Sequence, residues 1–277
     1  MICFNITSRT NPKVAEAASL SEKKFRDRLG LFRFDGIKLF REAAACRVGI
    51  RYVFVREDCA ASILPTVEKL RPDTQVFILS APAFDRVSDE KSPEGIITVA
   101  DKMTVHDALS KDGHVSPHAL SGPEAGRIIA LESVRDPGNV GTVVRAAAAF
   151  GIDTVLMSSD CADIFNPKTV RAAMGAIFSR RIIRVPDMEE AVLALKAAGR
   201  RTFATALLPD ALRLGEFEIA PLDVFVIGNE GHGLSEATIG RCDSPVFIPM
   251  MTGPGIESLN AATAASVIMY EQAKCLR

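Results

Sequence analysis

Residues 225–235 read FVIGNEGHGLS, an apolar run followed by a loop that contains three glycines. Gly228, Gly231 and Gly233 permit left-handed backbone or the close approach of another group, and Glu230 places a carboxylate at the tip. In an open α/β fold such a loop lies at the carboxyl edge of the sheet, where ligands bind. The GxGxxG and GxxxxGK[ST] fingerprints are absent from this position. We therefore expect neither a dinucleotide nor a nucleoside triphosphate held in the usual way.

Two further segments in the second half of the chain also follow a predicted apolar strand with a loop. Residues 132–151 read ESVRDPGNVGTVVRAAAAFG, with a DPG turn, Asn139 able to cap a helix, and Arg145 beside four alanines. Taken alone, Arg145 is a solvated surface residue or a placed cation. Residues 246–271 read VFIPMMTGPGIESLNAATAASVIMYE, in which a Gly-Pro-Gly turn leads to Ser258 and Asn260 at the entrance of an alanine-rich helix.

Short apolar strands alternate with helices around these segments. The pattern predicts an α/β domain with a parallel sheet covered on both faces. Its expected strands are 127–131, 154–158, 202–206, 224–227 and 246–248, and its helices are 140–150, 168–178, 189–198 and 260–274.

A smaller α/β unit precedes that domain. A helix over 11–29 begins with Asn-Pro, and residues 30–105 alternate strands at 32–34, 52–55, 76–79 and 96–99 with a helix at 37–45. A stretch rich in Gly, Pro, His and Ser separates the two units. The predicted organisation is a first domain over 1–108, a linker over 109–125 and a second domain over 126–277.

The three quoted segments together resemble the SpoU (TrmH-like) branch of the SPOUT RNA methyltransferases. The signatures of that family are N-x-G-x-x-x-R, G-N-E-G-x-G-[LI]-S, and I-P-M followed by S-L-N-x-[SA]. They stand here at 139–145, 228–235, 248–250 and 258–261, in the same order and spacing. Residues 6–20, 30–44 and 87–99 resemble the small RNA-binding domain, related to ribosomal proteins, that precedes the catalytic domain in many members. Asp35 replaces a common Glu, and 261–263 read Ala-Ala-Thr where Val-Ser is more usual.

The resemblance implies a C-terminal trefoil knot that binds S-adenosylmethionine, and transfer of its methyl group to a ribose 2′-hydroxyl. It implies donor-binding residues Ile227, Gly228, Asn229, Gly231, Ile248, Met250 and Leu259. It implies catalytic residues Arg145, Asn139, Glu230, Ser258 and Asn260. Arg145 would act as a base assisted by an RNA phosphate, or would stabilise the developing alkoxide; both remain open because a guanidinium is a poor base. Asn139 and Glu230 would orient the arginine or the ribose, and Ser258 and Asn260 the RNA phosphate or the donor. Asn139 and Ser258 could also serve only as helix caps.

Charge and resemblance both point to an RNA partner. Residues 1–56 hold 12 Lys/Arg against 5 Asp/Glu within a chain of net charge −1, which suits a polyanion, although a solvated charged helix would look the same. Ribosomal RNA is the expected substrate and transfer RNA the alternative. Family members are dimers through the knot region, so we expect a homodimer. Arg171 is a candidate contact to RNA phosphate, whereas His232 occupies a variable motif position and is not expected to be a base.

Composition narrows the cellular setting. The chain has 277 residues with 48% hydrophobic and 24% charged residues, and no run approaches the roughly 18 apolar residues that span a bilayer. The N-terminus has no apolar signal-peptide core, and the six cysteines form no CxxC pair. We therefore expect a cytoplasmic protein with no membrane segment, no disulfide framework and no structural zinc.

The sequence also bears on three other functions. A non-catalytic RNA-binding protein of the same fold would be favoured if Arg145, Glu230 or Asn260 were missing, and all three are present. A SPOUT enzyme that methylates a base nitrogen usually depends on an aspartate base and a different loop pattern. A nucleotide-dependent oxidoreductase would need the dinucleotide fingerprint that this chain lacks.

Overall fold

The computed structural model describes residues 2–104, 106–107, 114–121, 125–251 and 258–275. Residues 109–113 and 122–124 of the predicted linker and the Gly-Pro-Gly turn at 253–255 lie outside these residues. Contacts divide the chain into two compact units, one comprising Met1–Met103 with Asp163–Ser179 and the other Thr104–Ala162 with Arg180–Arg277. Each unit is described by itself.

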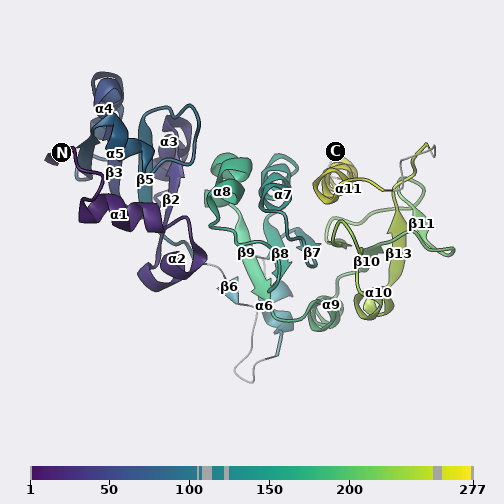
Figure 1. Ribbon diagram of the computed structural model, residues 1–277. Helices are drawn as coiled ribbons and strands as arrows, with labels where there is room; N and C mark the ends of the chain where they lie inside the picture. Colours follow the sequence, from purple (N-terminus) through teal and green to yellow (C-terminus); the bar gives the residue numbers. More distant parts are fainter. Residues whose placement is uncertain (1, 105, 108–113, 122–124, 252–257, 276–277) are drawn as a thin grey trace. The chain divides into compact units, whose positions relative to one another are not determined.

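The first unit is built on a five-stranded sheet in the order β1-β4-β3-β5-β2, of which β3, β5 and β2 lie side by side in Figure 1. Its strands are β1 (Ile2–Ile6), β2 (Leu31–Asp35), β3 (Ile50–Arg56), β4 (Gln75–Leu79) and β5 (Ile96–Asp101). β1, β4 and β3 run parallel, while β5 is antiparallel to both β3 and β2. One buried cluster packs the aromatic residues Phe54 and Phe84 against Val14 and Leu20 of the N-terminal helix region. The small α/β unit predicted from the sequence is therefore present, with β1 as an additional edge strand.

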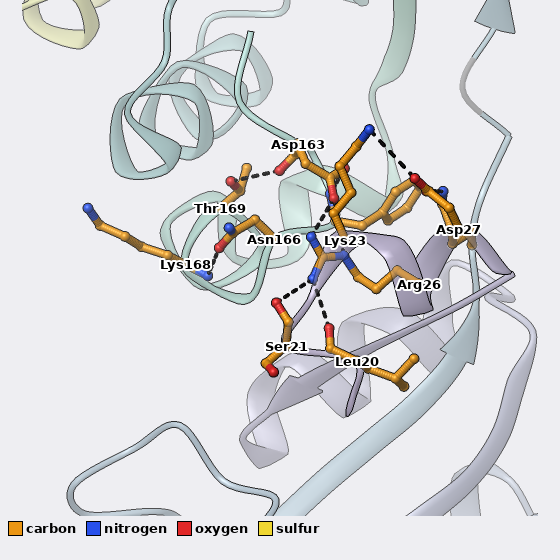
Figure 2. A network of polar contacts seen from close by, with 11 residues as sticks. Leu20, Ser21, Lys23, Arg26, Asp27, Asp163, Asn166, Lys168 and Thr169 are labelled. Carbon is orange, nitrogen blue, oxygen red and sulfur yellow. Dashed lines mark hydrogen bonds and ion pairs between the residues drawn. The ribbon is translucent and has the colours of Figure 1, made fainter. Parts of the chain in front are cut away.

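The described residues 2–104 form five α-helices in this unit: α1 (Pro12–Ser19), α2 (Lys23–Leu29), α3 (Ile37–Ala45), α4 (Ala60–Leu70) and α5 (Ala81–Asp85). The prediction of one helix over 11–29 is wrong, because the helix is interrupted between α1 and α2. The fully buried guanidinium of Arg26 explains the break. Its Nη1 donates to the main-chain oxygens of Leu20 and Ser21, both at 2.8 Å, which a continuous helix would have used internally (Figure 2).

The segment Asp163–Ser179 also packs within the first unit. It contains α8 (Pro167–Ala173) and the 3₁₀ helix η2 (Met174–Phe178), so the predicted single helix over 168–178 is wrong in its second half. The phenylalanine rings of Phe165 and Phe178 lie 5.1 and 5.3 Å from those of Phe32 and Phe34 on β2. Arg26 donates to one oxygen of Asp163 at 2.6 and 3.1 Å (Figure 2).

The second unit contains an eight-stranded sheet in the order β11-β13-β10-β12-β7-β8-β9-β6, and every neighbouring pair is parallel. Its strands are β6 (His106–Asp107), β7 (Ile128–Leu131), β8 (Thr154–Ser158), β9 (Arg181–Val185), β10 (Thr202–Thr205), β11 (Leu212–Arg213), β12 (Val224–Ile227) and β13 (Ser244–Phe247). The central strands β7, β8 and β12 are buried throughout, as expected for a sheet covered on both faces. The predicted parallel sheet is confirmed.

The helices of this unit are α6 (Pro117–Ser121), α7 (Pro137–Ala149), α9 (Met188–Ala197), α10 (Glu236–Arg241) and α11 (Ala261–Lys274). The cap of α7 is Asp136, whose carboxylate accepts the Asn139 N–H at 2.9 Å. The interpretation of Asn139 as the cap is therefore wrong. The cap of α11 is Asn260, not Ser258. The side chains of Asn139 and Ser258 are thus not used for capping.

No helix among the described residues is long and apolar enough to cross a membrane. The six cysteines carry free thiols. Within the described part of the chain, no three His, Cys, Asp or Glu side chains are grouped so that they could hold a metal ion.

Candidate active site

The loop that follows β12 is closed on itself. Asn229 and Gly233 exchange two main-chain hydrogen bonds of 3.0 and 2.9 Å, and the Asn229 side-chain oxygen accepts the Gly231 N–H at 2.8 Å. A Cβ atom on Gly228 would lie 2.3 Å from the Gly233 carbonyl carbon, so only glycine fits where the two loop strands meet. The tight turn holds the exposed carboxylate of Glu230 at its tip.

This loop is joined to the helix that follows β7. The Asn139 side-chain nitrogen, in the first turn of α7, donates to Glu230 Oε1. In turn, the side-chain nitrogen of Asn260 donates to the side-chain oxygen of Asn139 at 3.0 Å. The same Asn260 caps α11 by accepting the Ala262 N–H at 2.9 Å. One hydrogen-bonded chain of three side chains therefore unites the three sequence segments, which are up to 121 residues apart.

Beside this chain lies a cavity of about 290 Å³ at the carboxyl ends of β10, β12 and β13. All seven residues predicted to bind the methyl donor line it, together with Glu230 and Ser258 of the predicted catalytic set. Ala261 and Ala264 at the start of α11 add a wall without bulk. The cavity thus combines apolar side chains with loop backbone, a lining suited to an adenosine and an amino-acid tail.

Part of the cavity wall was missed by the sequence analysis. Thr205, the last residue of β10, and the two residues that follow the strand, Ala206 and Leu207, line it. Their contribution arises because β10 lies between β12 and β13, although it precedes both in the chain. No residue type in 205–207 signals a ligand, so only the strand order could have found them.

Arg145 lies apart from the cavity lining. Its side chain is exposed on α7, and no hydrogen bond or ion pair from it to another described residue is present. Asn139 and Asn260 also lie outside the lining and contact it through Glu230. Within one chain, the structure therefore gathers four of the five predicted catalytic residues and leaves Arg145 facing solvent.

The two other candidates named from the sequence have ordinary surroundings. His232 is exposed, and its main-chain N–H donates to the Asn229 side chain at 3.3 Å. Arg171 forms an ion pair of 2.5 Å with Glu90 inside the first unit. Neither lines the cavity.

Close to the segment 132–151, the carboxylate of Asp160 accepts several hydrogen bonds. Burial alone would raise the pKa of Asp160, but hydrogen bonds from Ser133, Ser158 and Arg135 outweigh it and hold that pKa below its ordinary value. Asp160 therefore stays ionised and fixes the turn that leads into α7.

Comparison with known proteins finds a family match for each half of the chain. Residues 126–270 match the model of the SpoU rRNA Methylase family, and residues 11–98 match an MRM3-like substrate binding domain. RlmP of Bacillus subtilis, a 23S rRNA (guanosine(2553)-2'-O)-methyltransferase, is 30% identical over 96% of this chain and 97% of its own.

Solved structures agree over almost the full length. An AdoMet-bound rRNA methyltransferase from Sinorhizobium meliloti covers 99% of both chains with 25% identity and a TM-score of 0.82. The SpoU methyltransferase AviRb from Streptomyces viridochromogenes, in complex with the cofactor AdoMet, covers 95% of this chain and 97% of its own with 25% identity and a TM-score of 0.80.

Fold, motifs and relatives together define an RNA methyltransferase. The chain belongs to the SpoU rRNA methylase family. Membership confirms the prediction of an enzyme that methylates a ribose 2′-hydroxyl of RNA and takes the methyl group from S-adenosylmethionine.

Proposed function

We propose that this protein methylates a ribose 2′-hydroxyl of ribosomal RNA. The observation that carries the proposal is the side-chain connection Asn260–Asn139–Glu230 beside one cavity, because it joins all three family motifs at a single place. Ribosomal RNA is preferred to transfer RNA because residues 11–98 match an MRM3-like substrate binding domain and RlmP acts on 23S rRNA.

The donor is proposed to bind in the cavity. The residues that would hold it are Ile227, Gly228, Asn229, Gly231, Ile248, Met250 and Leu259. They fit the group because Ile227, Ile248 and Leu259 offer apolar contact to an adenine, while the loop backbone around Gly231 offers polar groups to the ribose and the amino-acid tail. When bound, S-adenosylmethionine supplies an electrophilic methyl group on a sulfonium. The strand order, with β10 between β13 and β12, supports the proposed trefoil knot around this cavity.

Arg145 is proposed to act on the reacting hydroxyl. A guanidinium keeps its proton at neutral pH, so its contribution is to stabilise the negative charge that develops on the ribose oxygen while the hydroxyl proton passes to an RNA phosphate or to water. Asn139, Glu230 and Asn260 hold the RNA ribose in place beside the donor cavity, and Ser258, on the cavity wall, positions the donor or an RNA phosphate. Holding both reactants rigidly is worth roughly 7–11 kcal/mol of the barrier.

A homodimer is part of the proposal. Arg145 does not line the cavity of its own chain, and apolar side chains near that cavity are exposed, with Leu207 at 75% and Met251 at 93%. A second copy would cover these side chains and could bring its own Arg145 to the cavity. We further propose that residues 1–108 bind RNA, that 109–125 form a linker, that 126–277 form the catalytic domain, and that the enzyme works in the cytoplasm.

The test is the identity of the methylated product. Ribosomal RNA and transfer RNA from a strain that lacks this gene would be incubated separately with labelled S-adenosylmethionine, digested to nucleosides and analysed by mass spectrometry. Label in one 2′-O-methyl nucleoside of ribosomal RNA is expected. Label confined to transfer RNA would overturn the substrate, a base-methylated nucleoside would overturn the site of transfer, and no label in either RNA would favour a binding protein.

A further inference from the structure

Glu132 stands at the carboxyl end of β7, one residue beyond the strand, and its side chain reaches the far end of the 228–235 loop. Its Oε2 accepts the main-chain N–H of Ser235 at 3.1 Å. Its Oε1 accepts the hydroxyl of Ser235 at 2.9 Å and that of Thr238 at 2.8 Å. The main-chain N–H of Glu132 also donates to Ile227 on the neighbouring strand at 2.9 Å.

The 228–235 loop is therefore held at both ends by two adjacent residues. At its start, the side-chain nitrogen of Asn229 donates to the main-chain oxygen of Ser133 at 2.8 Å. At its end, Ser235 bonds to Glu132. Between these two points lie Glu230, which meets Asn139, and the glycines that line the donor cavity.

Capping of the next helix does not account for Glu132. The cap of α10 is Ser235, whose hydroxyl oxygen accepts the Thr238 N–H at 3.2 Å. The Thr238 side chain is fully buried, so its hydroxyl needs a partner inside the protein, and the Glu132 carboxylate is the acceptor. One ionised group thus collects three donors from the loop end, and hydrogen bonds to a charged group are stronger than those between neutral groups.

We propose that Glu132 is a positioning residue for methyl transfer, which fixes the 228–235 loop so that the donor cavity and the Asn139–Glu230 contact form together. Glu132 is absent from the cavity lining and acts through Ser235 and Thr238. The inference rests on the proposed donor site and adds to it the element that holds the site in shape.

Three variants test this role. Glu132→Ala removes all three hydrogen bonds. Glu132→Gln keeps an oxygen for the Ser235 N–H and turns its NH₂ group toward two hydroxyls that can accept, so it is the conservative rescue. Asp243→Ala is the matched control, because the Asp243 carboxylate likewise accepts a main-chain N–H and a hydroxyl, both from Thr202, at 2.8 and 2.9 Å. Thr202 begins β10, at the edge of the sheet opposite the loops.

Donor affinity is measured by calorimetry with S-adenosylmethionine alone, and kcat and KM are measured with ribosomal RNA from a strain that lacks the gene. For Glu132→Ala we expect a donor Kd about tenfold higher and a kcat about 10–100-fold lower, with KM for RNA little changed. Glu132→Gln should restore both to within about threefold. Asp243→Ala should lower the melting temperature without raising the donor Kd.

Two results would overturn the inference: wild-type donor affinity and kcat in Glu132→Ala, or an equal loss of donor affinity in Asp243→Ala. Because the binding measurement needs no RNA, it separates this inference from the proposed function. If the unaltered protein binds the donor but methylates no ribosomal RNA, the proposed substrate fails while the role of Glu132 in donor binding is still decided by the variants.

Discussion

At the level of single residues, Arg145 has a proposed role in the chemistry and contributes little to the structure. Its side chain is exposed and lies outside the donor cavity, so removing it should leave folding and donor binding intact. We expect Arg145→Ala to lower kcat by about 10²–10³-fold, the usual cost of losing one group that stabilises a developing oxyanion. Labelled methyl transfer to ribosomal RNA measures the rate, and calorimetry measures the donor Kd, which should stay within about twofold. A full rate in this variant would remove Arg145 from the mechanism.

Asp35 gives the first unit a dependence on pH. Burial raises its pKa to about 6; the positive charge of Arg33 opposes this shift, and the negative charges of Asp89 and Glu90 add to it. Its buried Oδ1 has no hydrogen-bond partner among the described atoms. Because the pKa is higher in the folded protein than in the unfolded chain, ionisation favours unfolding. The contribution of Asp35 to the free energy of unfolding should therefore fall as pH rises from about 4 to about 6, by on the order of 2–3 kcal/mol, and should then level off.

Asp35→Asn should remove that slope and leave the protein more stable than the parent above pH 6. Urea denaturation at several pH values between 4 and 7.5 measures the effect, with Asp73→Asn, an exposed aspartate of the same unit, as the control. Parallel pH profiles for the parent and Asp35→Asn would show that this carboxyl does not cause the slope.

Among elements, the 228–235 loop depends on one glycine. Gly228→Ala would place a Cβ atom 2.3 Å from the Gly233 carbonyl carbon and 2.5 Å from the Leu234 nitrogen, and both are main-chain atoms that cannot turn aside. We expect a loss of about 1–3 kcal/mol in stability and at least a tenfold weaker donor affinity, because the loop must open to accommodate the alanine side chain. Gly240→Ala, in α10 with open space around its Cβ position, is the matched control and should bind the donor normally. Equal donor affinities of the two variants would contradict the steric account.

The element scale also shows where sequence patterns stop being informative. The sequence motifs identified seven of the residues that line the cavity, because glycine-rich turns and strand ends are local features. The break between α1 and α2 was not local: it depends on Arg26 bonding to Leu20 and Ser21 while it pairs with Asp163, far away in the chain. The change from α8 to η2 likewise occurs at Met174, which has a φ of 52°, beside a Gly175 pressed against Glu42. Such endings are set by tertiary contacts that helix periodicity does not contain.

For the whole molecule, the discontinuous first unit has a consequence for truncation. Phe165 and Phe178 come from the second half of the sequence, yet their rings pack on Phe32 and Phe34. A chain that lacks residues 1–103 should expose both rings, bind a hydrophobic dye and aggregate on size exclusion. The same truncation with Phe165→Ser and Phe178→Ser should aggregate less. A monodisperse truncated chain that binds no dye would show that the segment 163–179 needs no partner.

Assembly is the property that the fold of one chain predicts least directly, because a parallel sheet with covered faces is stable alone. A dimer is favoured by what one chain leaves incomplete: Arg145 is exposed away from the cavity, and Leu207 on the cavity wall is 75% exposed. Light scattering should give twice the chain mass of 29.8 kDa. Leu207→Glu should yield monomers and a large loss of methyl transfer, because a charge at a dimer interface is costly to bury. Leu193→Glu, at a leucine that is 44% exposed on α9, should remain dimeric and active. If the unaltered protein is a monomer at micromolar concentration, Arg145 must reach the donor within its own chain.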